Sequence, residues 1–556
     1  MSRKRQHPTT RLNVESLENR EVPSITMNQT THVWTATGTE QSDIIIVDRQ
    51  PNNLVNLRIR IFDDTTGALR EQDVRTATNV NRVEVLGLGG IDLLINWTSK
   101  PSSLSGGSGS DTLIGGFGND TLVGGSGYED YIFTDSLPVV ANWAGSVIFS
   151  VIEPVNAPAV RMLGTDHIRE EGTYDYYDKI DLSGIKAGVS LDLAQIDVAQ
   201  TVQADRSFSL FLESTDGLAG IEYVTGTDYD DSLRGDAGEI SDLFGGKGND
   251  TLEGRGGYDT LRGFEGSDTY VFAGSNLGTD TILEYTHDLA ASSFGTDTLD
   301  FSQFDSAVNL DLNLTSDQTV SANNLILDGY YGSSNFRLIE NVIGSRFGDT
   351  IRGNALANKL QGRNGNDTLE GRGGDDELFG GADNDSYIFG NGKLDHDTIH
   401  ESSYLLVGTD TLYFSGFDAA MKLDLRVTTT QTVAQDYLKL TLDNGAGGVA
   451  SIENVFGSLF DDTIYGNNLG NWIGGGVGND TIYGLGGFDT LIGNVGTDKL
   501  YGGEDDDYLY GNVPGAITAR VEGDVLDGQG GKDYQETWIY VYWYGVPTLT
   551  RLIWTN

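Results

Sequence analysis

Acidic side chains recur at a fixed spacing behind glycines, in a pattern typical of oxygen-ligand sites. Three consecutive nonapeptides from Gly106 read GGSGSDTLI, GGFGNDTLV and GGSGYEDYI, with glycine at positions one and four, an acid at six and an apolar residue at eight. Similar arrays begin at Gly226, Gly344 and Gly457. Carboxylates beside turns with outward backbone carbonyls are the ligands that hard cations prefer. The pattern therefore predicts cation binding, and acids this abundant single out no catalytic pair.

The same period predicts the elements that position these acids. Glycine supplies the positive φ of a six-residue turn, and three residues with one inward apolar side chain form a short strand. Two such units make a coil of eighteen residues, so residues eighteen apart stack. The sequence therefore predicts an all-β fold, with parallel β-roll or β-solenoid arrays that alternate with β-rich spacer segments. Stacking places the acids in columns: Asp349, Asp367 and Asp385; Asp462, Asp480 and Asp498; Asp489 and Asp507; and Asp250 with Asp268.

Stacked carboxylates need a counter-charge. Parallel strands lie about 4.8 Å apart, and two carboxylates at that separation repel by roughly 3.5 kcal/mol at an effective dielectric of 20, or by about 1 kcal/mol in water. A Ca²⁺ ion between successive turns reverses the sign, because it accepts about six to eight oxygen ligands, whereas Mg²⁺ demands strict octahedral geometry. We therefore expect Ca²⁺ as the cofactor, and a chain that folds when the ion is supplied.

The nonapeptide GGxGxDxUx resembles the RTX, or hemolysin-type, calcium-binding repeat. This resemblance implies parallel β-rolls with calcium between the turns, and it gives the position-six aspartates the role of metal ligands. Glu129, Asn358 and Asn471 stand where the motif has Asp, so we leave them out. The candidate ligands are Asp111, Asp120, Asp231, Asp250, Asp259, Asp268, Asp349, Asp367, Asp376, Asp385, Asp462, Asp480, Asp489, Asp498 and Asp507.

The composition excludes several other partners. The chain has 556 residues, with 35 Lys and Arg against 82 Asp and Glu, a net charge of −47 that would repel nucleic acid and anionic membranes. The absence of cysteine excludes disulfides, thiol catalysis and cysteine metal sites. No apolar run is long enough to predict a membrane-spanning helix, so we expect no membrane insertion. The first two dozen residues lack the apolar stretch of a secretory signal peptide, and we expect no standard Sec signal.

The segments between the arrays also repeat. Each carries, in order, Tyr-x-Phe, a GTD-like element, a DxLDF-like element, Gln-Thr-Val and a closing Ile-Glu. Period-two alternation in VSLDLA, VNLDLNL and MKLDLRV predicts strands. These spacers either continue the solenoid without metal, form small β-inserts on its side, or present aromatic side chains to glycan or protein. The aromatic candidates are Tyr174, Tyr176, Tyr177, Tyr330 and Tyr331.

We expect caps at both ends, since a solenoid must hide its open sheet edges. The segment RLNVESLENREVPS resembles the ExLExR segment of some large bacterial surface proteins, and the C-terminal tail reads as a β-hairpin that could also serve as a type I secretion signal. The expected parts are an N-terminal export or sorting segment at 1–24, an N-terminal β cap at 25–105, arrays at 106–133, 226–272, 344–389 and 457–534, spacers at 134–225, 273–343 and 390–456, and a C-terminal β cap at 535–556.

We expect no catalytic site and no cofactor site other than calcium. His396 and His400 are four residues apart, as in a zinc-binding helix, but the equivalent segments of the other spacers read DHIRE and DTILE, which is a strand pattern. There is no GxSxG nucleophile elbow. Glycine recurs every nine residues rather than once before a helix, so no dinucleotide loop is predicted.

These features predict a calcium-binding, secreted or surface-exposed bacterial β-solenoid that is not an enzyme. We expect it to fold on calcium outside the cell and to act in adhesion, a matrix or a coat, with cell-surface glycan or matrix protein as partner. The alternatives are a secreted polysaccharide-modifying enzyme or other RTX exoenzyme whose repeats aid export and folding, and a calcium buffer. An enzyme would need a large non-repeating domain, and the longest non-repeating stretch is the segment before Gly106.

Overall fold

The chain is β throughout the part that the structure describes. No α-helix occurs in these residues, and η1 (Ala77–Asn79) is a short 3-10 turn. Residues 1–21 of the expected export segment and the five spacer tyrosines lie outside the described part. The chain divides into two compact units, Met1–Gly184 with Ile196–Gly220 and Ile185–Gln195 with Ile221–Asn556. The computed structural model describes residues 22–50, 53–134, 164–169, 178–203, 208–213, 220–238, 240–284, 295–322, 324–328, 338–401, 408–443, 452–511, 525–543 and 546–555.

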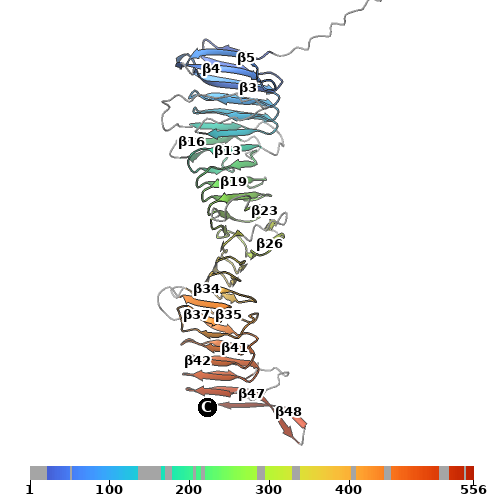
Figure 1. The fold of residues 1–556 in the computed structure, drawn as a ribbon, viewed down its shortest axis with the longest axis vertical. Helices are drawn as coiled ribbons and strands as arrows, with labels where there is room; N and C mark the ends of the chain where they lie inside the picture. Colours follow the sequence, from blue (N-terminus) through green and yellow to red (C-terminus); the bar gives the residue numbers. More distant parts are fainter. Residues whose placement is uncertain are drawn as a thin grey trace, which may run out of the picture. The chain divides into compact units, whose positions relative to one another are not determined.

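The first unit consists of coils that give strands alternately to two sheets (Figure 1). Its strands are β1 (Ser24–Met27), β2 (Val33–Thr37), β3 (Asp43–Gln50), β4 (Asn53–Asp63), β5 (Leu69–Thr76), β6 (Arg82–Gly89), β7 (Leu93–Asn96), β8 (Ser102–Ser108), β9 (Thr112–Ile114), β10 (Thr121–Ser126), β11 (Asp130–Thr134), β12 (Thr165–Arg169), β13 (Lys179–Gly184), β15 (Ala199–Gln203) and β16 (Phe208–Glu213). One sheet has the order β1-β2-β6-β8-β10-β12-β16-β15, and the other includes the order β5-β4-β3-β7-β9-β11-β13.

The second unit follows the same plan. Its earlier strands are β14 (Ser190–Asp192), β17 (Tyr223–Thr225), β18 (Ser232–Arg234), β19 (Asp242–Lys247), β20 (Thr251–Glu253), β21 (Thr260–Glu265), β22 (Thr269–Val271), β23 (Gly278–Ile282), β24 (Thr298–Asp300), β25 (Asn309–Asp311), β26 (Gln318–Ser321), β27 (Leu325–Asp328), β28 (Asn341–Ile343), β29 (Thr350–Arg352), β30 (Lys359–Asn364), β31 (Thr368–Glu370), β32 (Glu377–Ala382) and β33 (Ser386–Ile388). Its later strands are β34 (Asp395–His400), β35 (Asp410–Tyr413), β36 (Lys422–Asp424), β37 (Gln431–Ala434), β38 (Leu438–Asp443), β39 (Ile452–Phe456), β40 (Thr463–Tyr465), β41 (Trp472–Val477), β42 (Thr481–Leu485), β43 (Thr490–Val495), β44 (Lys499–Gly503), β45 (Tyr508–Tyr510), β46 (Val525–Gln529), β47 (Tyr534–Trp543) and β48 (Val546–Thr555).

These strands form long parallel ladders. The orders are β14-β18-β20-β22-β24-β28-β30-β32-β34-β38-β37, β25-β29-β31-β33-β35-β39-β41-β43-β45-β47-β48, β36-β40-β42-β44-β46 and, within this unit, β17-β19-β21-β23-β27-β26.

The pairing register confirms the eighteen-residue coil. Leu252 of β20 lies opposite Tyr270 of β22, and Leu122 of β10 lies opposite Leu104 of β8. The apolar residue of each triplet is buried between half-buried neighbours, as in Thr251–Glu253. Burying one such side chain stabilises the fold by about 1.5–3 kcal/mol, so the core is a ladder of single apolar residues. Each coil depends on its neighbours to cover that residue.

The spacers are solenoid coils that carry small hairpins. β12 pairs in parallel with β10, and β24 pairs in parallel with β22, so the ladders run through spacer segments. The Gln-Thr-Val segments form β15, β26 and β37, which pair antiparallel with β16, β27 and β38. Both structural alternatives therefore hold, because each spacer continues the solenoid and adds an antiparallel strand at its side.

Antiparallel strands occupy the ends of the sheets. β3, β4 and β5 form an antiparallel meander, and β1 pairs antiparallel with β2. At the C-terminus β47 and β48 form the expected hairpin, with Tyr534 opposite Thr555. Such strands cover ladder edges that would otherwise expose unpaired backbone groups.

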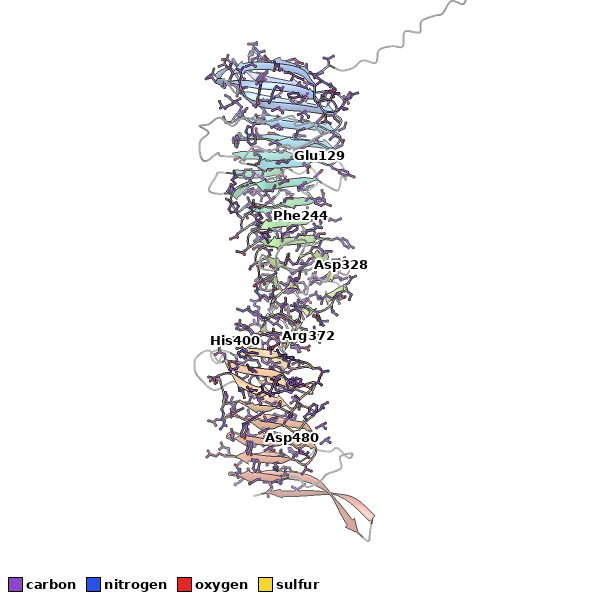
Figure 2. All side chains as sticks on the ribbon, in the orientation of Figure 1. Glu129, Phe244, Asp328, Arg372, His400 and Asp480 are labelled. Atoms are coloured by element: carbon purple, nitrogen blue, oxygen red, sulfur yellow. The ribbon has the colours of Figure 1, made fainter. Side chains whose placement is uncertain are left out.

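Two arginines join spacer strands to later array turns. The guanidinium of Arg372 donates to both carboxylate oxygens of Asp311, at 2.6 and 2.8 Å, and to the carbonyl of Gly353 at 3.0 Å. Figure 2 labels Arg372. Hydrogen bonding to Asp311 raises the pKa of Arg372. Arg255 and Asp192 form the same bidentate pair.

We expect Arg372→Ala to lower the free energy of unfolding of the calcium-loaded chain by about 1–2 kcal/mol, because a half-buried bidentate pair is lost. Denaturant titration measures this change. The control is Arg346→Ala, because Arg346 and its partner Asp305 are 62% and 49% exposed and such pairs contribute little. Equal losses in the two variants would contradict the prediction.

Candidate metal centres

The array aspartates form hydrogen-bonded ladders along the predicted columns. The backbone N–H of Asp462 donates to Asp480 Oδ1 at 2.8 Å, and the N–H of Asp480 donates to Asp498 Oδ1 at 2.9 Å. Asp480 is labelled in Figure 2. One carboxylate oxygen of each aspartate is thus bound to the preceding coil. Equivalent bonds join Asp349 to Asp367, Asp367 to Asp385, Asp489 to Asp507 and Asp250 to Asp268.

The second carboxylate oxygen has no hydrogen-bond partner in most of these residues. Asp480 is 1% exposed, and its Oδ2 is unpaired. A Cβ on Gly475, the first residue of the same repeat, would collide with this oxygen. Glycine at position one therefore makes room for the carboxylate. The same unpaired oxygen occurs in Asp92, Asp111, Asp120, Asp166, Asp250, Asp259, Asp268, Asp367, Asp376, Asp385, Asp489 and Asp507.

Backbone carbonyl oxygens stack beside the carboxylates. Gly478 and Gly496, at position four of their repeats, have φ of +142° and +152°. A Cβ on Gly496 would collide with the carbonyl oxygen of Gly478 and lie 3.2 Å from Asp498 Oδ1. Glycine is therefore needed for both its conformation and its small size. The turn offers carbonyl and carboxylate oxygens together, which is a donor set that fits Ca²⁺.

Burial disfavours the ionised form of these carboxylates when no cation is present. It raises the pKa of Asp480 to about 7 and that of Asp367 to about 8, and the neighbouring aspartates of each column add to the shift. A buried, unpaired charge is costly. Near neutral pH each such group therefore needs a proton or a cation.

The first aspartate of three arrays is different, because protein donors saturate its carboxylate. Asp462 Oδ2 accepts the N–H of Ser458 at 2.7 Å, and its Oδ1 accepts the Ser458 hydroxyl at 2.8 Å and the N–H of Met421 at 2.9 Å. We call a turn open where its aspartate keeps a buried, unpaired Oδ2, and the residue at position two of such a turn has a positive φ. Ser458 stands at position two of its repeat and does not have a positive φ. We call this arrangement a capped turn. Ser345 caps Asp349 and Thr227 caps Asp231 in the same way.

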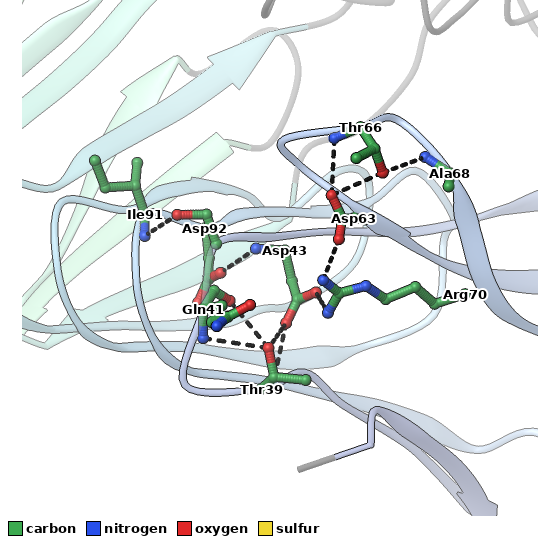
Figure 3. Close-up of polar contacts among 10 residues, drawn as sticks. Thr39, Gln41, Asp43, Asp63, Thr66, Ala68, Arg70, Ile91 and Asp92 are labelled. Carbon is green, nitrogen blue, oxygen red and sulfur yellow. Dashed lines mark hydrogen bonds and ion pairs between the residues drawn. The ribbon is translucent and has the colours of Figure 1, made fainter. Parts of the chain in front are cut away.

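The N-terminal cap contains a capped turn of its own (Figure 3). The N–H and hydroxyl of Thr39 donate to Asp43 Oδ2 at 2.6 and 2.8 Å. Arg70 donates to the other oxygen of Asp43 at 3.1 Å and also pairs with Asp63. The hydroxyl and the arginine here supply the positive potential that a metal would otherwise bring.

Asparagine closes two further turns. Asn471 Oδ1 accepts the N–H of Asn467 at 2.9 Å, and its Nδ2 donates to the carbonyl of Glu453 at 3.1 Å. Asn358 and Asn354 make the same pair. A neutral amide that is fully hydrogen-bonded needs no cation. Leaving Asn358 and Asn471 out of the ligand set is consistent with this geometry.

Acids of the spacers extend the columns beyond the nonapeptides. The N–H of Asp268 donates to Asp297 Oδ1 at 2.8 Å, and the N–H of Asp297 donates to Glu340 Oε2 at 2.9 Å. The N–H of Glu129 donates to Asp178 Oδ1 at 2.9 Å. Sequence reasoning missed these column members, although the recurring GTD, DxLDF and Ile-Glu elements were the signal. Further spacer members are Asp166, Asp280, Asp397, Asp410 and Glu453, and Asp533 of the isolated nonapeptide GQGGKDYQE extends the column of Asp489 and Asp507.

The two histidines belong to neither of the metal-ligand groups found among the described residues. They lie on strand β34, as the strand pattern predicts, and not on a helix. His396 Nε2 lies 2.9 Å from Thr441 Oγ1, and His400 Nδ1 lies 3.1 Å from Asp443 Oδ2. The ring of His400, labelled in Figure 2, stacks on Phe379 with centroids 4.1 Å apart. Each ring is therefore held by its own partners.

Stacked coils with glycine turns and unpaired buried carboxylates define a metal-binding parallel β-solenoid. The chain carries the RTX calcium-binding nonapeptide repeat, whose family description, of four copies, matches residues 103–128, 216–239, 244–276, 352–387, 448–482 and 474–509. These repeats bind calcium ions, as the resemblance implied. No curated protein matches the chain. Among the described residues, no helix has the length and apolar character needed to cross a membrane.

A bound Ca²⁺ would supply positive charge and accept the oxygens of the open turns as ligands. In each open-turn aspartate, a backbone N–H holds Oδ1, and Oδ2 has no protein partner. The repeat family and the fold favour a structural calcium-binding protein. We propose that the ligands are the open-turn aspartates and Asp498, and that Asp231, Asp349 and Asp462 hold their turns without an ion.

Proposed function

We propose that the chain is an exported, surface-exposed and non-catalytic scaffold that folds on calcium outside the cell and serves adhesion, a matrix or a coat. The observation that carries this proposal is the repeated buried Oδ2 without a protein partner. Each such group makes folding depend on an ion that is abundant outside cells, and modules of that environment bind Ca²⁺ with dissociation constants of about 10⁻⁴–10⁻³ M. In the calcium-poor cytosol the chain stays unfolded enough for export.

The capped turns support a scaffold in which some segments need calcium to fold and others do not. We propose that the arrays are segments stabilised by calcium, and that the capped turns and spacers between them fold on protein contacts alone. In the second unit Asp349 and Asn358 together give the third array a first coil without an open carboxylate. Asp462 and Asn471 do the same for the fourth array. Folding would then start at these coils and extend into the open turns as calcium binds.

Exposed aromatic side chains on the turns support a role in binding to a surface. Tyr258 is 70% exposed, Phe488 is 56% exposed and Phe460 is 44% exposed. Aromatic rings stack on apolar faces of ligands and are enriched at protein interfaces. Repetition along the coils would present several weak contacts at once, and multivalency converts such contacts into useful avidity. We propose cell-surface glycan or matrix protein as the partner.

The test uses cells that produce the protein, labelled with an impermeant biotin reagent. We expect the chain to be labelled on intact cells in millimolar Ca²⁺ and to become protease-sensitive when a chelator is added. A cytosolic marker protein, which must stay unlabelled, is the control. Recovery of the chain only from the cytosol would overturn the proposal. Modification of a polysaccharide by the purified chain, lost on replacing a single acid, would show instead that the protein is an enzyme.

A further inference from the structure

Two buried carboxylate triads lie where an array meets the following spacer. Asp268, Glu284 and Asp297 place carboxylate oxygens within 4.8 Å of one another, and all three residues are buried. Only Asp268 belongs to a nonapeptide; Glu284 and Asp297 come from the DTILE and DTLDF segments of the spacer. The second triad, in the third array and its spacer, consists of Asp385, Glu401 and Asp410.

A tyrosine sets the orientation of the glutamate in each triad. The Tyr270 hydroxyl accepts the N–H of Gly263 at 2.9 Å and donates to Glu284 Oε1. Tyr387 is placed in the same way, between Gly380 and Glu401. This explains why the last repeat of each of these arrays has tyrosine where the others have leucine or isoleucine.

Two oxygens of the first triad are buried and have no hydrogen-bond partner. Glu284 is 3% exposed and its Oε2 is unpaired, and Asp268 is 0% exposed and its Oδ2 is unpaired. Each of these residues also contributes one carboxylate oxygen to the group that lies within 4.8 Å. In the second triad Asp385 Oδ2 is likewise unpaired. A tyrosine hydroxyl therefore occupies one oxygen of Glu284, and a backbone N–H occupies one oxygen of Asp268, while the other oxygen of each is buried without a protein partner.

We propose that each triad binds one further Ca²⁺, which closes the array against its spacer and is additional to the ions held between nonapeptide turns. This inference rests on the proposed calcium-dependent folding and deepens it. The ligands are oxygens only, which suits a hard cation. A single ion held by Asp268 and by two spacer acids joins the array and the spacer into one cooperative structure.

A proton shared among the carboxylates is the competing account. In the metal-free fold, burial and the adjacent acids raise the pKa of Glu284 to about 10 and that of Asp297 to about 7. Glu340 lies beside the triad, since its Oε2 accepts the N–H of Asp297, and its carboxylate adds further negative charge there. The triad therefore needs a proton or a cation at neutral pH, and an experiment can separate the two.

The experiment counts calcium bound to the full chain by equilibrium dialysis at pH 7.5. We expect the double variant Glu284→Gln/Glu401→Gln to bind two fewer Ca²⁺ than the wild-type chain. The matched control is Glu377→Gln, which removes a charge from a side chain that is 53% exposed, and its count should not change. An unchanged count in the double variant would overturn the triad sites. A wild-type chain that binds no Ca²⁺ would instead overturn the proposed function.

A second variant covers the case in which the glutamine variant does not fold. Tyr270→Phe/Tyr387→Phe keeps every carboxylate but releases the two glutamates from their hydroxyl partners. We expect the full count of ions, with two of them bound at least about fivefold more weakly. An unchanged isotherm would contradict the proposal. Mg²⁺ in place of Ca²⁺ should leave both triads without an ion, and equal binding of the two metals would overturn the choice of calcium.

Discussion

Removing calcium with a chelator at pH 8 should unfold the open-turn coils. Many buried carboxylates would then face one another with neither proton nor metal, and adjacent pairs repel by roughly 3.5 kcal/mol at an effective dielectric of 20. Circular dichroism should show a large and cooperative loss of β-structure that millimolar Ca²⁺ restores. Hydrogen exchange should place the loss in residues 106–126, 244–270, 362–388 and 475–510. The N-terminal turn of Asp43, which Thr39 and Arg70 satisfy, is the internal control and should stay protected.

Acid should partly replace calcium. Burial raises the folded-state pKa of Asp250 to about 8 and those of Asp376 and Asp489 to about 7, well above the ordinary value of 3.8. The metal-free fold therefore binds more protons than the unfolded chain between about pH 4 and pH 8, so the stability that these groups contribute is greatest below about pH 4, falls as pH rises and levels off near pH 8. Calcium affinity should rise over the same window, by up to about tenfold per pH unit for each proton displaced.

Two results would contradict these expectations. Identical spectra in chelator and in millimolar Ca²⁺ at pH 8 would mean that the open carboxylates do not control folding. Metal-free protein that loses structure as pH falls from 8 to 5 would mean that the buried aspartates are stabilised as anions. Calcium titrations at pH 6, 7 and 8, followed by circular dichroism, measure both properties.

Asp480→Asn should raise the calcium concentration at the folding midpoint by at least about tenfold and lower the number of bound ions. Asp480 lies in the middle of its column, so its carboxylate borders the coils on both sides. The amide keeps the acceptor for the Asp462 N–H and removes the charge. Calorimetry and equilibrium dialysis measure the two changes.

The matched control is Asp462→Asn, one coil earlier in the same column. Ser458 and Met421 already satisfy this carboxylate, so we expect an unchanged number of calcium ions and a loss of about 1 kcal/mol in stability from the weakened cap. Equal effects of the two substitutions would mean that capped and open turns do not differ in function.

The sequence alone predicts the coil and its columns. Glycine at positions one and four, an acid at six and an apolar residue at eight predict a coil of two nonapeptides, or eighteen residues. The register of Leu252 with Tyr270 confirms this coil length. The strand at His396 and the hairpin at β47 and β48 follow from period-two alternation in the same way. These features are local, because each is decided by φ and by side-chain direction within a few residues.

The state of each carboxylate could not be predicted from the nonapeptide. Asp462 and Asp480 have the same position in their repeats, yet one is saturated by Ser458 and by the N–H of Met421, 41 residues earlier. Position two carried only part of the signal: the capped turns have Ser, Thr or Asn there, but Asn494 occupies the same position with a φ of +71°, as in the open turns. The residue type at position two can be interpreted only when the backbone conformation of the turn is known.

The sequence by itself determined the fold class, the calcium-binding repeat and the stacking of the acids, because each follows from a nine-residue pattern that is complete within a single coil. Only the tertiary structure decided which acids share a column across array and spacer. Asp268, Glu284 and Asp297 are separated by 16 and then 13 residues, and no period relates them. They meet because the parallel pairing of β22 with β24 returns the chain to the same turn, where burial removes the water that would otherwise screen the repulsion among three carboxylates.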